Sequence, residues 1–235
     1  MPVAQQHRHL PTSLETFMSL ESRYRPSSFR DITFATPIQD MALSPYLSGL
    51  SRRPLIFHGS PGGGKTGTAK LLPAAICPDI QQADILELNG SKDNGIDKVR
   101  DVFDGFARTT KSNSLDLGVI IINEADGLSK DAQDALKGEM EKVSEYCLVI
   151  MTTNNIHRIQ APIRDRCRLV EFPLPSAQLL LPLAQRIMRD HGEDVSEDHL
   201  LAVLSADTWP VGHLSYRKMF ERVETLVAMR RRAAE

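Results

Sequence analysis

The chain has 235 residues, of which 41% are hydrophobic and 25% charged, and its formal net charge is −2. A chain of this length can bury a full core as one α/β domain, with or without a small companion domain. The balanced charge excludes a uniformly basic nucleic-acid-binding chain, so any contact with nucleic acid must come from a local basic face. No apolar run approaches the roughly 18 residues of a membrane span, and the polar residues 1–7 lack signal-peptide character. These features predict a cytoplasmic protein, in the host cytoplasm if it is viral, with no membrane partner.

The cysteines Cys77, Cys147 and Cys167 form an odd, widely spaced set without a C-x-x-C pair. This pattern indicates neither a disulfide framework nor a zinc site. We therefore interpret them as reduced thiols.

The first stretch, to about Met41, is polar and interrupted by prolines, which predicts an arm that packs on the rest of the chain. A short helix is expected over residues 40–50, and an apolar strand begins at Leu55. The next helix is expected to begin near Lys65. It should bend or end near Pro73, because proline removes a hydrogen-bond donor and clashes with the preceding turn.

A glycine-rich loop between that strand and that helix fits G-x-x-x-x-G-K-[ST] without a mismatch. Its glycines let the backbone turn sharply and bring successive N–H groups close to a polyphosphate, beside a helix N-terminus. Lys65 would reach the β- and γ-phosphates, and the Thr66 hydroxyl would bind Mg²⁺. A glycine-rich turn without a ligand is the alternative, which the flanking strand and helix disfavour. The residues predicted to bind nucleotide are Gly59, Ser60, Pro61, Gly62, Gly63, Gly64, Lys65 and Thr66.

Beyond the loop, apolar runs of strand length alternate with amphipathic stretches of helical length. The run at 118–122 is apolar throughout, which is typical of a central parallel strand buried on both faces. This order predicts a P-loop, doubly wound, five-stranded parallel sheet. Besides the strand at Leu55, the expected strands are 85–88, 118–122, 147–151 and 169–172, and the expected helices are 96–108 and the one from the cap Ser129 to Lys142.

Pro173 and Pro175 mark a boundary, since the segments beyond them read as helices with no strand between them. The sequence therefore predicts an α/β nucleotide-binding domain with its N-terminal arm over residues 1–173. A small helical lid domain is expected over residues 174–235, and the glycine-rich loop should face the cleft between the two. The expected lid helices are 176–191, 196–206 and about 213–232.

Glu124 follows the buried strand at its carboxyl end, next to the predicted loop. A carboxylate at this position can orient and deprotonate a water molecule that attacks the terminal phosphate. A solvated loop carboxylate is the alternative, which the predicted sheet topology disfavours.

Three more segments accompany the loop: Arg23-Tyr24-Arg25-Pro26, then Leu88-Asn89-Gly90-Ser91 with residues 95–100, and residues 161–167. In combination they resemble the AAA+ ATPases and, within them, clamp-loader ATPase subunits of the phage-type large-subunit or replication factor C small-subunit kind. The resemblance extends from about Arg23 to Glu224. It implies an AAA+ fold that binds ATP and Mg²⁺. The partners that it implies are other AAA+ clamp-loader subunits in a ring, a sliding clamp and primer-template DNA.

The resemblance also implies roles outside the loop. Residues 161–167 are similar to a Ser-Arg-Cys element whose arginine, here Arg166, would act on the γ-phosphate held by a neighbouring subunit; a surface salt bridge is the alternative. Arg217 is similar to a lid arginine that closes on the nucleotide. Asn154 resembles a sensor of the γ-phosphate or the attacking water, with a turn asparagine as the alternative. Tyr24 and Arg25 would either line the adenine pocket or only pack.

The segment that begins at Leu88 is similar to the one that leads into a DNA-facing helix of clamp loaders. Cations at a helix N-terminus favour a phosphate there, which gives a contact independent of base sequence. Charges on a solvated helix face are the alternative, because Asp93, Asp97 and Asp101 lie among them. The predicted DNA contacts are Lys92, Asn94, Lys98 and Arg100.

The chain differs from this family pattern at the end of the central strand, where Asn123 replaces an aspartate that supports Mg²⁺. Asparagine keeps the hydrogen bonds and loses the negative charge, so we expect ATP binding to survive and hydrolysis to be weakened. The predicted metal contacts are Thr66 and Asn123. Asp165 replaces a serine and would restrain Arg166 by a local ion pair. No segment matches the helical collar domain of clamp-loader subunits, which predicts that it is absent, supplied by another chain or removed by truncation.

These observations predict an enzyme: a Mg-ATP-dependent ATPase subunit of a DNA sliding-clamp loader. ATP would close the subunits around a clamp and primed DNA, and hydrolysis would release them. Two alternatives stay open, namely another AAA+ machine such as a helicase loader or protein remodeller, and a nucleotide-binding module with weak hydrolysis. The predicted catalytic groups are Glu124, Lys65, Arg166, Asn154 and Arg217.

Overall fold

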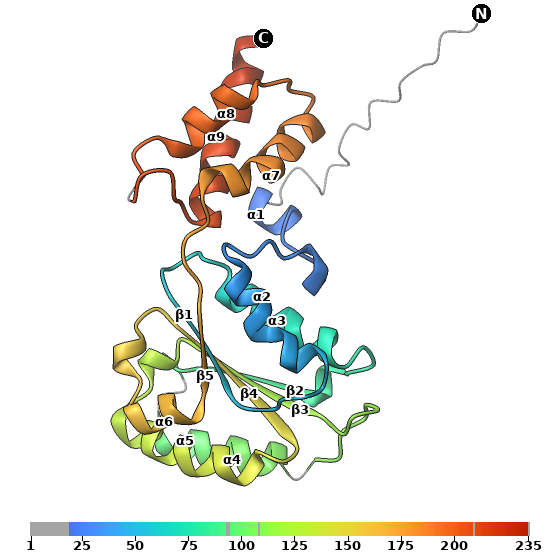
Figure 1. Cartoon of the computed structure of the whole chain (residues 1–235), viewed down its shortest axis with the longest axis vertical. Helices are drawn as coiled ribbons and strands as arrows, with labels where there is room; N and C mark the ends of the chain where they lie inside the picture. Colours follow the sequence, from blue (N-terminus) through green and yellow to red (C-terminus); the bar gives the residue numbers. More distant parts are fainter. Residues whose placement is uncertain (1–18, 93–94, 108, 209, 235) are drawn as a thin grey trace, which may run out of the picture.

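The structure is a computed structural model that describes residues 19–92, 95–107, 109–208 and 210–234 (Figure 1). Its sheet layer contains five strands, and helices and turns connect them. The strands are β1 (Leu55–His58), β2 (Ile85–Asn89), β3 (Gly118–Asn123), β4 (Cys147–Thr153) and β5 (Arg168–Glu171).

The five strands form one parallel sheet in the order β2-β3-β4-β1-β5. β1, which leads into the glycine-rich loop, therefore lies between β4 and β5. Parallel strands are covered on both faces and read as continuous apolar runs, and residues 118–122 of β3 are indeed all buried. The predicted five-stranded, doubly wound parallel sheet is confirmed.

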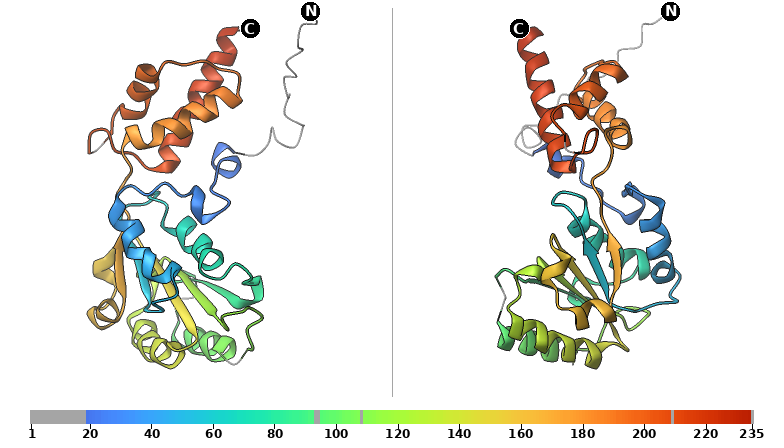
Figure 2. Two further views of the ribbon diagram at one scale, coloured as in Figure 1. Left: turned by 45° about the vertical axis from the view of Figure 1, so that its right-hand side comes forward. Right: turned by 60° about the vertical axis from the view of Figure 1, so that its left-hand side comes forward.

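Two helical layers cover the faces of the sheet (Figures 1 and 2). Successive side chains of a strand point to opposite faces, so Leu55 and Phe57 of β1 join one core cluster while Ile56 joins the other. One face packs against α2 (Pro37–Leu47) and α3 (Lys65–Ile76). The other packs against α4 (Ile96–Ala107), α5 (Lys130–Val143) and α6 (Ala161–Arg166).

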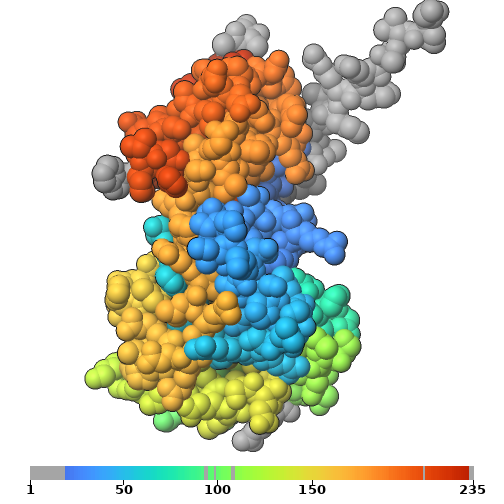
Figure 3. Space-filling view, in the orientation of Figure 1, coloured from blue at the N-terminus to red at the C-terminus, as the bar shows by residue number. Residues whose placement is uncertain are grey.

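A third core cluster joins the C-terminal helices α7 (Ala177–Asp190), α8 (Glu197–Ser205) and α9 (Tyr216–Ala234). Leu20 from the short helix α1 (Leu20–Arg23) packs into this cluster, so the arm reaches across to the helical part. The space-filling view shows the C-terminal helices, the N-terminal segment and the sheet layer stacked along the long axis (Figure 3). The division into residues 1–173 and 174–235 stays a prediction.

The arm beyond α1 packs through aromatic rings. Phe34 lies edge-on to Phe29, at 5.8 Å between ring centroids, and to Phe172, at 6.5 Å. Phe172 in turn lies 4.9 Å from Phe57 of β1. Edge-on aromatic pairs add to the stabilisation from burial alone, so these rings tie the arm to the strand that precedes the loop.

Helix α3 does not end at Pro73 but continues to Ile76. The proline removes one backbone donor, and the residue is buried. The Cys77 N–H donates to the Pro73 carbonyl at 2.9 Å, which closes the final turn. Among the described residues, no helix combines the length and the apolar character that crossing a membrane requires.

Candidate functional site

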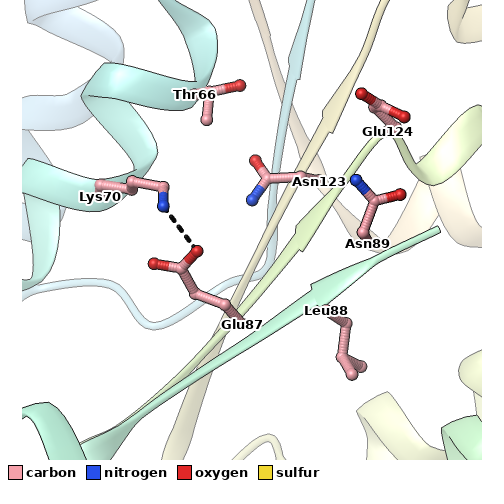
Figure 4. Close-up of a pocket in the computed structure, with 7 residues that line it drawn as sticks. All are labelled: Thr66, Lys70, Glu87, Leu88, Asn89, Asn123 and Glu124. Atoms are coloured by element: carbon pink, nitrogen blue, oxygen red, sulfur yellow. Dashed lines mark ion pairs between the residues drawn. The ribbon is translucent and has the colours of Figure 1, made fainter. Parts of the chain in front are cut away.

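A cavity of about 420 Å³ opens at the carboxyl ends of β2 and β3, beside the start of α3 (Figure 4). Ligands of open α/β sheets bind at this edge, where the strands end and the helices begin. Asn89 and Asn123 are register partners on the two strands, so they lie at the same level of the cavity. The lining residues are Thr66, Lys70, Glu87, Leu88, Asn89, Asn123 and Glu124.

The loop at residues 59–64 has a backbone that glycine alone adopts without strain. Gly59, Gly62 and Gly64 have φ angles of 135°, 78° and 93°, which side chains rarely permit. A Cβ on Gly59 would lie 2.3 Å from the Phe172 carbonyl oxygen, and one on Gly62 would lie 2.6 Å from the Ser215 Cβ. The loop therefore packs closely between the segment after β5 and the start of α9.

We expect Gly59→Ala to lower the free energy of unfolding by about 3 kcal/mol or more, because it combines a strained φ with a clash against backbone. Gly67→Ala is the control: its Cβ would meet nothing within 4 Å, and α3 begins just before it. We expect this control to raise stability by up to about 1 kcal/mol. Urea unfolding of both variants measures the difference, and equal midpoints for Gly59→Ala and the unaltered chain would contradict the clash.

Lys65 begins α3 and is 6% exposed. Its ammonium donates to the loop carbonyls of Gly59 at 2.7 Å and Ser60 at 2.8 Å. Burial lowers the pKa of Lys65 to about 8, and the negative charge of Asp126 partly offsets this shift. A buried ammonium beside the backbone of the loop is suited to binding an anion, which is the role predicted for Lys65.

The turn after β3 places Glu124 at the rim of the cavity. Glu124 has φ 53° and ψ 45°, a left-handed conformation that is strained for a residue with a side chain. Its N–H donates to the Thr152 hydroxyl at 3.3 Å, and its carbonyl accepts from the Gly127 N–H at 2.8 Å. Gly90 packs against this turn, since a Cβ there would lie 2.5 Å from the Glu124 carbonyl oxygen. Strained backbone of this kind is found at functional sites, where the surrounding structure holds it.

Asn123 lies between Thr66 and Glu124 on the cavity wall (Figure 4). Its side-chain oxygen accepts from the Thr152 hydroxyl at 3.3 Å. Thr152 on β4 thus donates to Asn123 and accepts from Glu124. One buried hydroxyl therefore contacts the side chain of the last residue of β3 and the main chain of the residue that follows it.

Within the described ranges, no cluster of three or more His, Cys, Asp or Glu side chains could hold a metal ion by itself. The cavity offers the Thr66 hydroxyl and the Asn123 amide oxygen instead. Mg²⁺ takes oxygen ligands and retains waters, and it is commonly held by few protein groups together with substrate phosphates. The residues present therefore fit a Mg²⁺ ion that binds with a nucleotide.

Asn154 follows the end of β4 and is exposed, as a residue that contacts a ligand in the predicted sensor position would be. The side chains of its neighbours Thr153 and Asn155 accept local hydrogen bonds. The Thr153 hydroxyl accepts from the Asn155 N–H at 3.0 Å, and the Asn155 side chain accepts from the His157 N–H at 3.1 Å. Of the three residues, Asn154 is thus the one whose side chain these local hydrogen bonds leave out, and the sensor role stays a prediction.

The start of α9 lies directly on the loop. The Tyr216 N–H donates to the Gly62 carbonyl at 3.0 Å, and the Tyr216 hydroxyl donates to the Thr33 carbonyl at 2.7 Å. Burial raises the pKa of Tyr216 to about 12, which keeps this hydroxyl protonated as a donor. Arg217 is the next residue and is exposed. The structure therefore brings the predicted lid arginine into the neighbourhood of the loop.

Arg166 ends α6, and its donors are engaged on the chain's own surface. Its Nε and Nη2 lie 2.8 and 2.7 Å from Glu141 Oε1 on α5, and Nη1 donates to the Pro162 carbonyl at 2.8 Å. The prediction that Arg166 forms an ion pair with Asp165 is wrong, because the partner of Arg166 is Glu141. Residue 165 is helical and next to Arg166 in the chain, whereas α5 packs beside α6 and presents Glu141 to the guanidinium.

Arg53, just before β1, forms hydrogen bonds with the C-terminal end of α6. Its Nε donates to the Arg166 carbonyl at 3.1 Å, and its Nη2 donates to the Asp165 carbonyl at 2.8 Å. The last carbonyls of a helix have no partner within the helix, so an arginine there satisfies them. The strand that leads into the loop is thereby linked to the helix that carries Arg166.

Tyr24 contacts the helical part of the molecule. Its hydroxyl donates to Asp190 on α7 at 2.9 Å, and the Arg186 guanidinium lies 5.8 Å from the ring centroid. Arg25 forms an exposed ion pair of 3.6 Å with Glu21. The structure thus shows the packing alternative for Tyr24, and an adenine contact for Tyr24 or Arg25 stays a prediction.

The predicted DNA contacts lie at and before α4. Lys92 and Arg100 are exposed. Asn94 lies outside the described residues, and Lys98 belongs to α4 but its side chain is not described. The structure therefore places two of the four charged or polar groups on the surface and leaves a shared face for them as a prediction.

Four cavity-lining residues were not predicted as site residues: Lys70, Glu87, Leu88 and Asn89. Lys70 lies one helical turn after Thr66, and Asn89 ends the strand beside Asn123, so both spacings were available in the sequence. No spacing in the sequence indicates that Glu87 lines the cavity. Its place in the cavity depends on β2 being the register partner of β3.

Comparison with known proteins assigns this fold and loop to a family. The family model described as "ATPase family associated with various cellular activities (AAA)" matches residues 55–174, just over half of the chain. The chain therefore belongs to the AAA family, and the predicted AAA+ fold and family are confirmed.

Among its relatives are proteins named Replication factor C small subunit. The one from Archaeoglobus fulgidus is 32% identical over 192 residues, which are 81% of this chain and 60% of that protein. One from Methanococcus maripaludis is 36% identical over 159 residues, which are 67% of this chain and 50% of that protein. The predicted resemblance to clamp-loader subunits is thus confirmed, while the chain spans only about half to three fifths of the length of these relatives.

Solved structures share the fold at lower identity. A RuvB variant from Thermotoga maritima has a TM-score of 0.62 at 16% identity, over 86% of this chain and 73% of that one. A DNA polymerase III gamma subunit-related protein from the same organism has a TM-score of 0.55 at 16% identity, over 79% and 57%. At this identity the likeness establishes the fold alone.

Proposed function

We propose that the chain is the ATPase subunit of a DNA sliding-clamp loader, which binds and hydrolyses Mg-ATP at a site shared between subunits. One observation carries the proposal: Thr66, which ends the loop of residues 59–66, and the pair Asn123 and Glu124 line one cavity at the carboxyl edge of the sheet. The similarity to proteins named Replication factor C small subunit supports the choice of a clamp loader over other AAA machines.

Each of the predicted site residues has its own role in phosphoryl transfer to water. Loop N–H groups and Lys65 hold the β- and γ-phosphates, and Thr66 and Asn123 hold Mg²⁺. Mg²⁺ supplies charge neutralisation on the phosphates when bound. Glu124 orients the water and takes its proton, while Asn154 positions the γ-phosphate or the water. Arg217 approaches the nucleotide from α9.

A neighbouring subunit completes the site with its own Arg166. The arginine ends α6, which packs on the opposite face of the sheet from α3 (Figure 1). An exposed ion pair such as Arg166 with Glu141 contributes only about 0–1 kcal/mol. The guanidinium can therefore exchange Glu141 for a phosphate of the next subunit at low cost. The partners are other AAA+ subunits in a ring.

The clamp and primer-template DNA are the substrates of this cycle. Lys92, Lys98 and Arg100, with Asn94, contact DNA phosphates near the start of α4, without reading bases. ATP binding closes the ring on the clamp and DNA, and hydrolysis releases both.

ATP hydrolysis measured with the chain in its complete assembly tests this function. We expect slow turnover alone, an increase with primed DNA, and a further increase when the cognate sliding clamp is added. Stimulation by a protein substrate alone, without DNA or clamp, would replace the clamp loader by another AAA+ machine.

A nucleotide-binding module with weak hydrolysis is the second candidate, which Asn123 favours because it brings no negative charge to the metal. We expect Asn123→Asp to raise turnover about tenfold, since the carboxylate keeps the acceptor for the Thr152 hydroxyl and adds the missing charge. Steady-state phosphate release at saturating Mg-ATP measures the change. Turnover that stays the same in Asn123→Asp would show that position 123 does not limit hydrolysis.

A further inference from the structure

Lys70 on α3 and Glu87 on β2 form an ion pair at the cavity (Figure 4). The Lys70 Nζ lies 2.7 Å from Glu87 Oε2. Both side chains line the cavity together with Thr66 and Asn123. Lys70 is one turn after Thr66 on α3, so its side chain extends from the same face of the helix.

The cavity brings a cation close to the residues predicted to hold the metal. Of the seven residues that line it, Lys70 carries the positive charge, Glu87 and Glu124 are carboxylates, and Asn123 at the end of β3 is neutral. The Lys65 ammonium donates to the carbonyls of Gly59 and Ser60. Lys70 is thus a cation beside Thr66 and Asn123, where a divalent metal would be bound.

Lys70 can leave Glu87 at little cost. The two side chains are 47% and 36% exposed, and ion pairs in such positions contribute little to stability. A lysine ammonium sits on a flexible four-carbon stem and acts as a point charge toward phosphate. A polyphosphate in the cavity would therefore compete with the Glu87 carboxylate for the same ammonium.

We propose that Lys70 is a second phosphate-binding cation, which makes nucleotide binding by this chain only weakly dependent on Mg²⁺, and that Glu87 restrains it. Two features act in the same direction. Asn123 provides no charge to attract a divalent cation, and the Lys70 ammonium both repels such a cation and neutralises phosphate in its place. The inference rests on the proposed function only in requiring that a nucleoside triphosphate binds in this cavity.

Calorimetric titration of the purified chain with a non-hydrolysable ATP analogue, in excess Mg²⁺ and in EDTA, tests the proposal. We expect the dissociation constant of the unaltered chain to rise less than about threefold in EDTA. Lys70→Met should weaken binding in EDTA about tenfold, the scale of one lost hydrogen bond between charged groups. Glu87→Gln should tighten it about twofold to fivefold, because the ammonium is released. Both changes should shrink to less than about twofold in Mg²⁺, where the metal neutralises the phosphates.

Two further variants separate this effect from a loss of structure. Lys70→Arg keeps the charge and should bind as the unaltered chain does. Lys70→Met with Glu87→Gln should bind as Lys70→Met alone, because Glu87 acts only through Lys70. Equal weakening by Lys70→Met and Glu87→Gln, or no effect of Lys70→Met in EDTA, would overturn the proposal. An unaltered chain that binds no nucleotide in either buffer would overturn the proposed function instead.

Discussion

Arg166→Ala should reduce the ATP turnover of the assembled ring by about 10³-fold or more, the range observed when an arginine finger is removed. The loss would follow from charge, because in the proposed function the guanidinium stabilises negative charge that develops on the γ-phosphate only in the transition state. Nucleotide binding should change less than about threefold, because most ground-state contacts come from the loop of the subunit that holds the nucleotide. Turnover and binding are measured separately, by phosphate release and by calorimetry.

Mixing experiments show whether the arginine acts on its neighbour. Rings that contain both Arg166→Ala and Lys65→Met chains should recover part of the turnover, since an intact loop can meet an intact Arg166 at some interfaces. Arg189→Ala is the matched control, because Arg189 is also exposed but lies on α7. An equal loss of turnover in the isolated Arg166→Ala chain would contradict action in trans.

Glu141→Ala completes this comparison, because Glu141 holds Arg166 at 2.7 Å in the single chain. Removal of the carboxylate leaves the guanidinium free to meet a phosphate, so Glu141→Ala should not lower turnover. A loss similar to that of Arg166→Ala would instead mean that Glu141 is needed to orient the finger.

Glu124→Gln should lower turnover about 10²- to 10⁴-fold, the usual contribution of a general base. Glutamine keeps the shape of the side chain and loses the ability to take a proton. The left-handed backbone of residue 124 and its hydrogen bond to Thr152 involve main-chain atoms, so the turn should survive the substitution. Single-turnover kinetics with saturating ATP measures the chemical step directly.

Nucleotide affinity and thermal stability serve as the internal controls for Glu124→Gln, and both should stay close to those of the unaltered chain. Glu145→Gln is a matched substitution, since Glu145 is an exposed carboxylate that precedes β4, at the opposite edge of the sheet. A Glu124→Gln chain that retains more than about a tenth of its turnover would show that another group takes the proton.

The sequence by itself determined the features that depend on local chemistry. The glycines of residues 59–64 predict a backbone conformation that other residues rarely adopt, and the structure shows positive φ at three of them. The apolar run before Asn123 predicts a strand buried on both faces, and strands alternating with helices predict that the sheet is parallel. Helix caps are equally local, as at Ser129, whose side chain accepts from the Ala132 N–H.

Tertiary structure alone decided the contacts between segments far apart in the chain. Arg166 pairs with Glu141 and not with adjacent Asp165, because α5 and α6 pack side by side. Tyr24 meets Asp190 across most of the sequence, and the strain at Glu124 depends on the Gly90 and Thr152 that surround it. The Lys70–Glu87 pair likewise exists only because β2 lies beside β3. Periodicity and turn chemistry report what one segment requires, whereas such pairs depend on how packed elements place their side chains.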